Sequence, residues 1–451
     1  MQATRLSQLT QPLDGKLIGD DTAVGDISID TRTINSGDCF IAIKGPNFDG
    51  HEFIAEAFAK GATAAIVERP MPVGISQLIV SNTDQALTNI AILHRQSIDI
   101  PIISVTGSCG KTTTKSMIAS IMSHMGFVHA GKKSFNNHYG VPLTLLGIDS
   151  TQHDYAVVEM GANHQGEIAQ LTAITRPNIA VITMAAPVHL EGFGSIEGVA
   201  AGKGEIFQGL PEEGIAIINQ EDFYAEYWKK LCSGKTIKTF GYSQAADFWA
   251  DDITVDAEQH PKFCLHTPNG EMSITLPLLG EHNINNALAA AAAAATASAG
   301  ADLKAIQKGL QAMTPVDKRL IKRVGRLGIE ILDDSYNANP TGLKAALKVL
   351  ANSNKQKILV LGEMAELGEK AQEFHQQLGL QAKQHGVAEL YALGKLTEHT
   401  VAAFGEGGHY FTEQKTLIER LVKNIVPNMC VLVKGSNCNR LDKVVDALLE
   451  V

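Results

Sequence analysis

One stretch of this sequence decides the fold: IISVTGSCGKTTTK, residues 102–115. Its first four residues, Ile102–Val105, form a short and mostly apolar run that predicts a buried strand, and the segment Thr112–Met125 is typical of a helix. Between them, Gly107 and Gly110 can turn backbone amides inward around phosphate oxygens, where the helix N-terminus adds partial positive charge. The order of strand, glycine loop and helix therefore predicts a phosphate-binding loop.

The polar residues of this loop suit a nucleoside triphosphate. Lys111 can bridge β- and γ-phosphates, and Thr112 can ligate Mg²⁺. The loop departs from the general pattern G-x-x-x-x-G-K-[ST], because position 105 is Val and the first glycine lies three residues before Gly110. A glycine turn that merely starts a helix is the alternative interpretation. We expect the phosphate contacts to come from Gly107, Ser108, Cys109, Gly110, Lys111, Thr112 and Thr113.

The rest of the chain repeats this alternation in three regions. Apolar, β-branched runs precede helical stretches, which indicates parallel sheets covered on both faces. The predicted strands are Ile27–Ile29, Cys39–Ile43, Ala64–Val67, Ile102–Val105, Tyr155–Val158, Ile179–Thr183, Gly214–Ile218, Ile329–Leu332, Lys357–Leu361, Leu390–Leu393 and Cys430–Val433. Further helices are expected at Phe53–Lys60 and Arg440–Leu449. We therefore predict an α/β protein of three domains, residues 1–83, 84–313 and 314–451.

The composition narrows the function classes. The 451 residues are 45% hydrophobic and 19% charged, which excludes global disorder. Lysine and arginine number 38 against 48 acidic residues, and the net charge of −10 argues against a nucleic-acid-binding surface. Six scattered cysteines fit a reducing compartment, no secretory signal is visible, and the apolar run Ala287–Ala295 is too short to span a bilayer. We expect a cytoplasmic monomer without nucleic-acid partners.

Candidate metal ligands follow two of the predicted strands. Glu159 ends the strand Tyr155–Val158, and a carboxylate near a phosphate loop is a suitable Mg²⁺ ligand. His189 follows the strand Ile179–Thr183, at the sheet edge where open α/β sheets gather ligands. Lys203 comes next in the chain. A solvated acid, a structural histidine and a helix-surface lysine are the alternatives.

Two further polar groups lie later in the chain. Asn283 and Asn286 are three residues apart, so they share a helix face, and their amides could read a base edge or simply cap the helix. The strand ending in Asp333 and Asp334 runs into a polar turn. Because two adjacent acids are costly to bury together, we expect at least one to face a ligand or solvent, with turn capping as the alternative.

These motifs occur in the order seen in the Mur ligases, which the sequence resembles from about Asp30 to Arg440. Mur ligases are ATP-dependent amide-bond synthetases of peptidoglycan assembly. The motifs that carry the resemblance are Gly107–Thr113, Glu159-Met160-Gly161, His189, Lys203-Gly204-Glu205, His282–Ala287 and Asp334–Pro340. The resemblance implies a small α/β UDP-sugar-binding domain, a central P-loop-type ATPase domain and a C-terminal Rossmann-like domain.

Within the family, the resemblance points to the step that adds D-alanyl-D-alanine to UDP-N-acetylmuramoyl-tripeptide. The D-N-P-R motif expected of the ligase for the preceding residue is absent. The informative segments are Asp30-Thr31-Arg32, Gly37–Ala42, Gly45–His51, Ser134–Leu145 and Leu361–Gly368. Transfer of the γ-phosphoryl group of ATP to the terminal carboxylate would give an acyl phosphate, which the dipeptide amine would attack.

The resemblance also implies roles for single residues. Lys111 and Thr112 hold phosphates and a first Mg²⁺, while Glu159, His189 and a carbamylated Lys203 support a second Mg²⁺. The C-terminal domain contributes to nucleotide closure and dipeptide binding. Nucleotide contacts are implied for Asn283, Asn286, Asp334 and one arginine, either Arg319 or its neighbours Arg323 and Arg326. Substrate contacts are implied for Thr31, Arg32, Lys44, Ser134, Asn136, Asn137, Asn337 and Asn339.

Two other protein classes share part of this pattern. A folate polyglutamylating synthetase shares the central motifs, but it would not explain the Asp30–His51 pattern or Asn136-Asn137. A nucleotide-switch GTPase should carry an N-K-x-D motif that reads guanine, and the chain has none. The sequence does not distinguish diaminopimelate from lysine as the third residue of the peptide.

Overall fold

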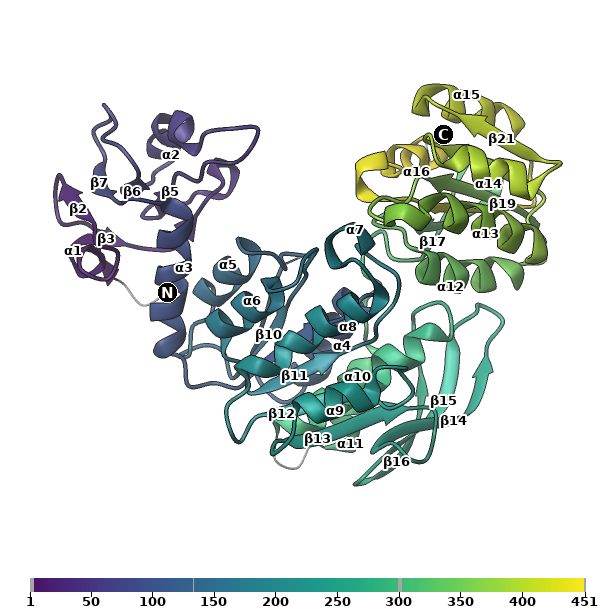
Figure 1. The fold of residues 1–451 in the computed structure, drawn as a ribbon, viewed down its shortest axis with the longest axis horizontal. Helices are drawn as coiled ribbons and strands as arrows, with labels where there is room; N and C mark the ends of the chain where they lie inside the picture. Colours follow the sequence, from purple (N-terminus) through teal and green to yellow (C-terminus); the bar gives the residue numbers. More distant parts are fainter. Residues whose placement is uncertain (1–3, 133, 299–301, 450–451) are drawn as a thin grey trace.

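The computed structural model describes residues 4–132, 134–298 and 302–449, and three α/β units follow one another along the chain (Figure 1). The first unit holds a five-stranded sheet in the order β2-β7-β6-β5-β4. Its strands are parallel except β2, and β1 and β3 form a separate antiparallel pair. The elements are β1 (Thr4–Arg5), α1 (Leu6–Thr10), β2 (Lys16–Ile18), β3 (Ala23–Val24), β4 (Ile27–Ser28), β5 (Cys39–Ile41), α2 (Ile54–Ala59), β6 (Ala64–Val67) and β7 (Ser76–Ile79).

The central unit is built on a nine-stranded sheet in the order β16-β15-β14-β13-β12-β11-β8-β10-β9. From β9 to β14 neighbouring strands are parallel, whereas β14, β15 and β16 are antiparallel. The strands are β8 (Ile102–Thr106), β9 (Val128–Ala130), β10 (Tyr155–Glu159), β11 (Ile179–Ile182), β12 (Ile215–Asn219), β13 (Thr236–Gly241), β14 (Phe248–Val255), β15 (Pro261–Thr267) and β16 (Gly270–Thr275).

Helices cover both faces of this central sheet, because alternate residues of its buried strands are apolar on both sides. On one face Ile102, Ala156 and Ile182 join the core under α3, α5, α6 and α8; on the other, Ile103 and Val157 pack with α4, α10 and α11. The helices are α3 (Thr83–Gln96), α4 (Lys111–Met122), α5 (Gly140–Leu146), α6 (Glu167–Thr175), α7 (Leu190–Phe193), α8 (Ile196–Gly204), α9 (Ala225–Leu231), α10 (His282–Ala297) and α11 (Leu303–Gln311).

The C-terminal unit has a six-stranded sheet in the order β17-β18-β22-β19-β20-β21, parallel except for β17. Helices on both faces bury it in two apolar clusters. The elements are β17 (Ile321–Val324), β18 (Glu330–Asp334), α12 (Pro340–Ala351), β19 (Gln356–Gly362), α13 (Ala371–Gln384), β20 (Glu389–Leu393), α14 (Thr397–Phe404), β21 (Gly408–Phe411), α15 (Gln414–Asn424), β22 (Met429–Lys434) and α16 (Asp442–Leu449).

The structure confirms the α/β class and the predicted buried strands, with ends shifted by one or two residues. The expectation of purely parallel sheets is wrong at the edges, where β2, β17 and the β14–β16 extension run antiparallel. These strands were missed because their outer faces are exposed, so they lack the continuous apolar run of a fully buried strand. The helix expected at Phe53–Lys60 begins as a 3₁₀ turn over Gly50–Phe53 and becomes α-helical at Ile54.

The alanine run at residues 287–295, which is too short to span a bilayer, lies in α10. Ala289 to Ala294 are completely buried among α4, α11 and the central sheet, where larger side chains would hold these elements apart. In the part of the chain that the structure describes, no helix combines the length and the hydrophobicity that crossing a bilayer requires.

Candidate active site

A cleft of about 1640 Å³ opens between the central and C-terminal units, at the carboxyl ends of their parallel strands. This is the edge where open α/β sheets bind ligands. Both units contribute predicted site residues to its walls. They are Ser108, Cys109, Gly110, Lys111, Thr112, Thr113, Ser134, Asn136, Asn137, Glu159, His189, Asn283 and Asn286 from the central unit, and Arg319, Asp334, Asn337 and Asn339 from the C-terminal unit.

The phosphate loop connects β8 to α4 and needs both of its glycines. Gly107 and Gly110 have φ angles of +141° and +82°, which side chains rarely adopt. A Cβ at Gly107 would lie 1.9 Å from Thr183 Oγ1, and one at Gly110 would lie 2.2 Å from Asn286 Oδ1. The loop therefore packs too closely against β11 and α10 to accept any side chain at these positions. Gly107 itself supports the loop from behind rather than lining the cleft.

Lys111 folds back over the loop that precedes it. Its Nζ donates to Gly107 O at 2.7 Å and to Ser108 O at 3.4 Å. Burial lowers the pKa of Lys111, and the charge of Glu159 opposes this shift. The lysine therefore lies at the loop on which the sequence analysis placed phosphate binding.

Glu159 ends β10 with only 1% of its surface exposed. Its Oε1 accepts from Thr112 Oγ1 at 3.1 Å and from Asn136 Nδ2 at 2.8 Å. Its Oε2 accepts no hydrogen bond from the described residues and lies 3.3 Å from Lys115 Nζ. A buried carboxylate oxygen without a hydrogen bond, next to a hydroxyl on the phosphate loop, is a hard-oxygen donor set that fits Mg²⁺.

His189 lies in the cleft, but a residue of the C-terminal unit holds it. Its backbone is left-handed, with φ of +51°, and this turns the chain from β11 into α7. Its Nδ1 hydrogen-bonds the carboxylate of Glu366, and Glu191 N donates to Glu366 O at 3.4 Å. Burial lowers the pKa of His189, although Glu366 opposes the shift. A metal ion would therefore bind Nε2 or displace Glu366.

Lys203 lies on α8 behind the cleft wall and does not line it. Only 1% of its surface is exposed; its Nζ donates to Ala162 O at 3.2 Å and lies 4.9 Å from the centre of the Phe193 ring. Burial, aided by the nearby charge of Lys111, lowers the pKa of Lys203 to about 7. The interpretation of Lys203 as a helix-surface charge is therefore wrong, and its burial favours the neutral amine over the charged form.

Asn283 and Asn286 both face the cleft from α10, as the shared-face argument predicts. Neither caps the helix, because the residue at its N-cap is Glu281. Asn286 Nδ2 donates to Asn283 Oδ1 at 2.9 Å, and Asn286 Oδ1 accepts from Thr114 Oγ1 at 3.3 Å. Asn286 thus supports the helix that begins at the phosphate loop.

On the opposite wall, Asp333 and Asp334 are both buried, with 2% and 8% exposed. The two adjacent acids can be buried together because each has a cationic partner. Asp333 Oδ2 lies 3.0 Å from Arg323 Nε, and Asp334 pairs with Lys434 Nζ. Asp334 lines the cleft, as expected of at least one of the two acids. Burial raises its pKa, and the charge of Lys434 works against that shift.

Of the three candidate arginines, Arg319 lines the cleft. Its guanidinium lies 4.1 Å from the centre of the Tyr336 ring, and its buried Nε has no hydrogen-bond partner among the described residues. Arg323 is instead held by Asp317 and Asp333. Stacking and an unused donor leave Arg319 as the arginine suited to meet an anionic ligand.

Lys434 is a cleft residue that the sequence analysis missed. It ends β22, is 4% exposed, and donates to Asn337 O at 3.0 Å as well as pairing with Asp334. A signal was present, because Lys434 directly follows the predicted strand Cys430–Val433 and thus lies at the ligand-binding edge. Asn339, by contrast, caps α12 through Gly342 N and accepts from Cys109 Sγ at 3.4 Å, so it links the two walls.

The expected substrate contacts divide into two groups. Ser134, Asn136 and Asn137 line the cleft, whereas Thr31, Arg32 and Lys44 lie in the first unit and do not. Figure 1 shows this unit at the far end of the central unit from the C-terminal one. Arg32 Nη2 pairs with Asp30 Oδ2 at 2.6 Å, and Thr31 Oγ1 donates to Glu56 at 2.9 Å. The structure thus leaves these three residues apart from the cleft.

Comparisons with known proteins agree with this arrangement along the chain. Three family descriptions match in succession: Mur ligase family, catalytic domain, over residues 24–115; Mur ligase middle domain, over 105–294; and Mur ligase, glutamate ligase domain, over 319–437. An Escherichia coli protein named UDP-N-acetylmuramoyl-tripeptide--D-alanyl-D-alanine ligase is 42% identical over 453 residues, covering 100% of this chain and 99% of that protein.

Two solved structures are similar along nearly their whole length. A crystal structure of MurF from Acinetobacter baumannii has a TM-score of 0.90 and 33% identity, with 100% of both chains covered. A MurF ligase from Thermotoga maritima in complex with ADP has a TM-score of 0.80 and 26% identity, covering 94% of this chain and 96% of that one. The resemblance inferred from the motif order is confirmed, and the chain belongs to the Mur ligase family.

Proposed function

We propose that this protein uses ATP to join D-alanyl-D-alanine to UDP-N-acetylmuramoyl-tripeptide. The observation that carries the proposal is the two-walled cleft, in which a phosphate loop on one side faces Arg319, Asp334 and Lys434 on the other. The full-length similarity to the E. coli protein of that name supports the choice of substrates. The product is UDP-N-acetylmuramoyl-pentapeptide, a precursor of peptidoglycan.

The first step brings two anions together, the triphosphate and the terminal carboxylate of the tripeptide. Lys111 and Arg319 lie on opposite walls of the cleft, where each can neutralise charge on the transferring phosphoryl group. Thr112, Glu159 and His189 would hold Mg²⁺, which supplies further charge neutralisation when bound. The carboxylate oxygen attacks the γ-phosphorus, the bond to ADP breaks, and an acyl phosphate forms.

The second step joins the dipeptide. The neutral amine of D-alanyl-D-alanine attacks the acyl carbon, phosphate leaves, and the amine loses a proton as the amide forms. Water must be kept from the acyl phosphate, so the walls must close over it. We place dipeptide binding on the C-terminal side, where Asn337 and Asn339 line the cleft.

Lys203 is proposed to carry a carbamate. Its ammonium group would first lose one proton, and the neutral amine would then add CO₂ and lose a second proton. A buried cation thus becomes an anion that can support a second Mg²⁺. Three features support the assignment. The residue is 1% exposed, its pKa is lowered to about 7, and the nearby positive charge of Lys111 disfavours its protonated form. A neutral amine is the form that reacts with CO₂.

Each of the three domains has its own role in the proposed reaction. Residues 1–83 would bind the UDP-sugar through Thr31, Arg32 and Lys44; residues 84–313 would bind ATP; and residues 314–451 would close over the nucleotide. Because the first unit lies apart from the cleft, its movement toward the cleft would complete the site. We also place the enzyme in the cytoplasm and expect it to be a monomer.

The test is release of phosphate from ATP by the purified protein. Release should require both UDP-N-acetylmuramoyl-tripeptide and D-alanyl-D-alanine, and either substrate alone should give only background. Release with dihydrofolate and glutamate instead would refute the proposal. A substrate panel that varies only the third residue, diaminopimelate against lysine, then defines the natural tripeptide.

A further inference from the structure

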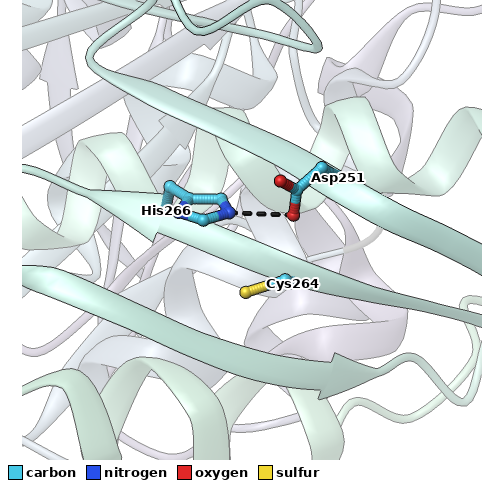
Figure 2. A group of neighbouring side chains, drawn as sticks. All are labelled: Asp251, Cys264 and His266. Carbon is cyan, nitrogen blue, oxygen red and sulfur yellow. Dashed lines mark hydrogen bonds and ion pairs between the residues drawn. The ribbon is translucent and has the colours of Figure 1, made fainter.

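Away from the cleft, three side chains of metal-ligand type gather on the antiparallel extension of the central sheet. Figure 2 shows Asp251 on β14 beside Cys264 and His266 on β15. One ligand atom from each lies within 4.8 Å of the other two. Among the residues that the structure describes, no other group of three histidine, cysteine or carboxylate side chains comes as close.

The strand register places these residues on one face. Asp251 pairs with Cys264 and Trp249 with His266, so each strand contributes two side chains, spaced two residues apart, to the same face. The residues between them, Ala250 and Leu265, point the opposite way and are buried in the core against α10. The group is therefore a feature of a regular sheet and not of a loop.

The histidine is held on three sides. Its Nε2 hydrogen-bonds Asp251 Oδ1 at 2.8 Å, and its Nδ1 lies 3.2 Å from Glu271 Oε2. Trp249 stacks on the ring with centroids 3.7 Å apart and planes only 3° from parallel. A carboxylate on one ring nitrogen is the arrangement that orients metal-bound histidines, and it leaves the other nitrogen facing Asp251 and Cys264.

The donor set distinguishes between metal classes. One nitrogen, one sulfur and one carboxylate oxygen suit zinc and similar divalent ions, whereas Mg²⁺ takes oxygen ligands and avoids thiolates. Around a tetrahedral zinc ion, the histidine nitrogen would lie about 3.3 Å from the carboxylate oxygen and about 3.6 Å from the sulfur. The present spacing of 2.8 Å between Asp251 and His266, and of at most 4.8 Å in the group, requires only small side-chain rotations.

We propose that Asp251, Cys264 and His266 bind one zinc-class divalent ion, with a water molecule completing the tetrahedron. The ion would replace the hydrogen bond between Asp251 and His266 and displace the thiol proton of Cys264. Glu271 would orient the histidine from behind. This site is separate from the Mg²⁺ ligands of the cleft, because it lies on other strands of the central sheet.

The position of the site suggests what the ion would do. It would fasten β14 to β15, and the turn of this hairpin reaches the C-terminal unit, where Glu258 lies 3.0 Å from Lys322. Val255 and Gln259, at the same end of the hairpin, line the cleft. A bound ion would therefore stiffen the β14–β15 hairpin, whose turn contacts the C-terminal unit.

The test is a titration of the metal-stripped, full-length protein with Co²⁺ in the presence of saturating Mg²⁺ and ADP, so that the nucleotide cleft is filled. We expect one equivalent to bind and to give a near-ultraviolet sulfur-to-cobalt charge-transfer band. Cys264→Ser should abolish the band, and Glu271→Gln should weaken binding by about 10- to 100-fold. Cys438→Ser, which changes an exposed cysteine, is the matched control and should leave the titration unchanged.

Thermal melting of each variant without metal checks that it is folded. If Cys264→Ser is unfolded, Asp251→Asn is the second variant, and it should weaken Co²⁺ binding more than Glu271→Gln does. Zinc should raise the melting temperature of the unmodified protein and of Cys438→Ser but not that of the ligand variants. A thiolate band that persists in Cys264→Ser, or no binding at one equivalent, would overturn the proposal.

Discussion

The phosphate loop and the first domain differ in whether their proposed ligand-binding residues already lie together. Around the loop, the groups that would meet ATP already line one cleft: Lys111, Glu159 and Asn286 on one wall, Arg319 and Asp334 on the other. In the first domain, Arg32 and Thr31 bond to Asp30 and Glu56 of their own domain instead. The residues that we propose for the nucleotide are thus largely brought together, whereas those that we propose for the UDP-sugar are divided between two places.

This difference has a physical cause. The loop is fixed by local geometry, because its glycines pack against Thr183 and Asn286 with no room for a side chain. The proposed substrate residues belong to two separate units. The distance between the two groups therefore depends on the relative orientation of the units. Substitutions in the loop should therefore affect the chemical step directly, and substitutions in the first domain should affect substrate capture.

The largest effect is expected for Lys111→Ala. Loss of the charge that meets the phosphoryl group should lower kcat by about 100- to 1000-fold, the cost of removing one preorganised donor. Steady-state phosphate release with all three substrates measures the change. Lys415→Ala, which removes a lysine whose side chain is 87% exposed, is the control and should match the unmodified enzyme. A kcat within a few-fold of normal would remove Lys111 from the mechanism.

Lys203→Ala should come next, with activity lowered by about 10- to 100-fold, the usual cost of disturbing groups that support a metal site. Added formate or acetate should restore part of the rate, because a small carboxylate can take the place of the carbamate anion. Lys203→Arg should lose activity without any rescue, since the added carboxylate would have no space. An alanine variant that carboxylates do not rescue at all would contradict the carbamate.

The same lysine predicts a pH dependence. Its pKa is lowered to about 7, and CO₂ reacts only with the neutral amine, so the carbamate fraction should rise as the pH increases through about 7 and fall below it. Activity in CO₂-depleted buffer should recover on addition of bicarbonate, and more completely at pH 8 than at pH 6. Equal recovery at both values would argue that another group controls the profile.

A smaller and more selective effect is expected for Arg32→Ala. The arginine belongs to the first domain, so the KM for UDP-N-acetylmuramoyl-tripeptide should rise about tenfold, as one charge-assisted contact is lost. Binding of a fluorescent ADP analogue should stay unchanged, because Arg32 is remote from the cleft. Weakened nucleotide binding in this variant would mean that the two sites are less separate than the structure indicates.

Local sequence was enough to predict the loop and several of the side chains that line the cleft. A strand, two glycines and a helix follow one another within residues 102–125, so their order alone predicted the loop. Glu159 and Asn286 were found because each lies at a recognisable point of a strand or helix. The buried alanine run and the most apolar parallel strands were visible too, since fully buried elements carry continuous apolar runs. The parallel strands β7, β9, β13 and β21 were not predicted.

Contacts between distant residues were not visible in the same way. Lys434 pairs with Asp334 across 100 residues of sequence, and Glu366 meets His189 across 177, so neither partner could be assigned from spacing. The antiparallel strands β14–β16 were missed because only one face is buried. The net charge of −10 was informative about nucleic acid, yet the cleft collects Lys111, Arg319 and Lys434. Overall charge thus describes the surface and not the site.

The contact between His189 and Glu366 gives the smallest predicted effect. It bears most directly on how the C-terminal domain closes over the central one. Glu366 comes from the C-terminal domain and binds the Nδ1 of a residue that we propose as a Mg²⁺ ligand. Its side chain is 40% exposed, and a pair of this kind contributes at most about 1 kcal/mol, roughly fivefold in an equilibrium constant. Glu366→Gln should therefore lower the Mg²⁺ concentration for half-maximal activity by about two- to fivefold.

The measurement is a Mg²⁺ titration of phosphate release at saturating ATP, with Glu369→Gln as the control, because this exposed acid lies on the same segment. If Glu366 competes with the metal, the Mg²⁺ concentration for half-maximal activity falls while kcat stays constant. If Glu366 instead holds His189 in the orientation that the metal needs, the midpoint shifts to higher Mg²⁺ concentration. The direction of the shift thus decides whether the contact between the domains belongs to the resting enzyme or to the working one.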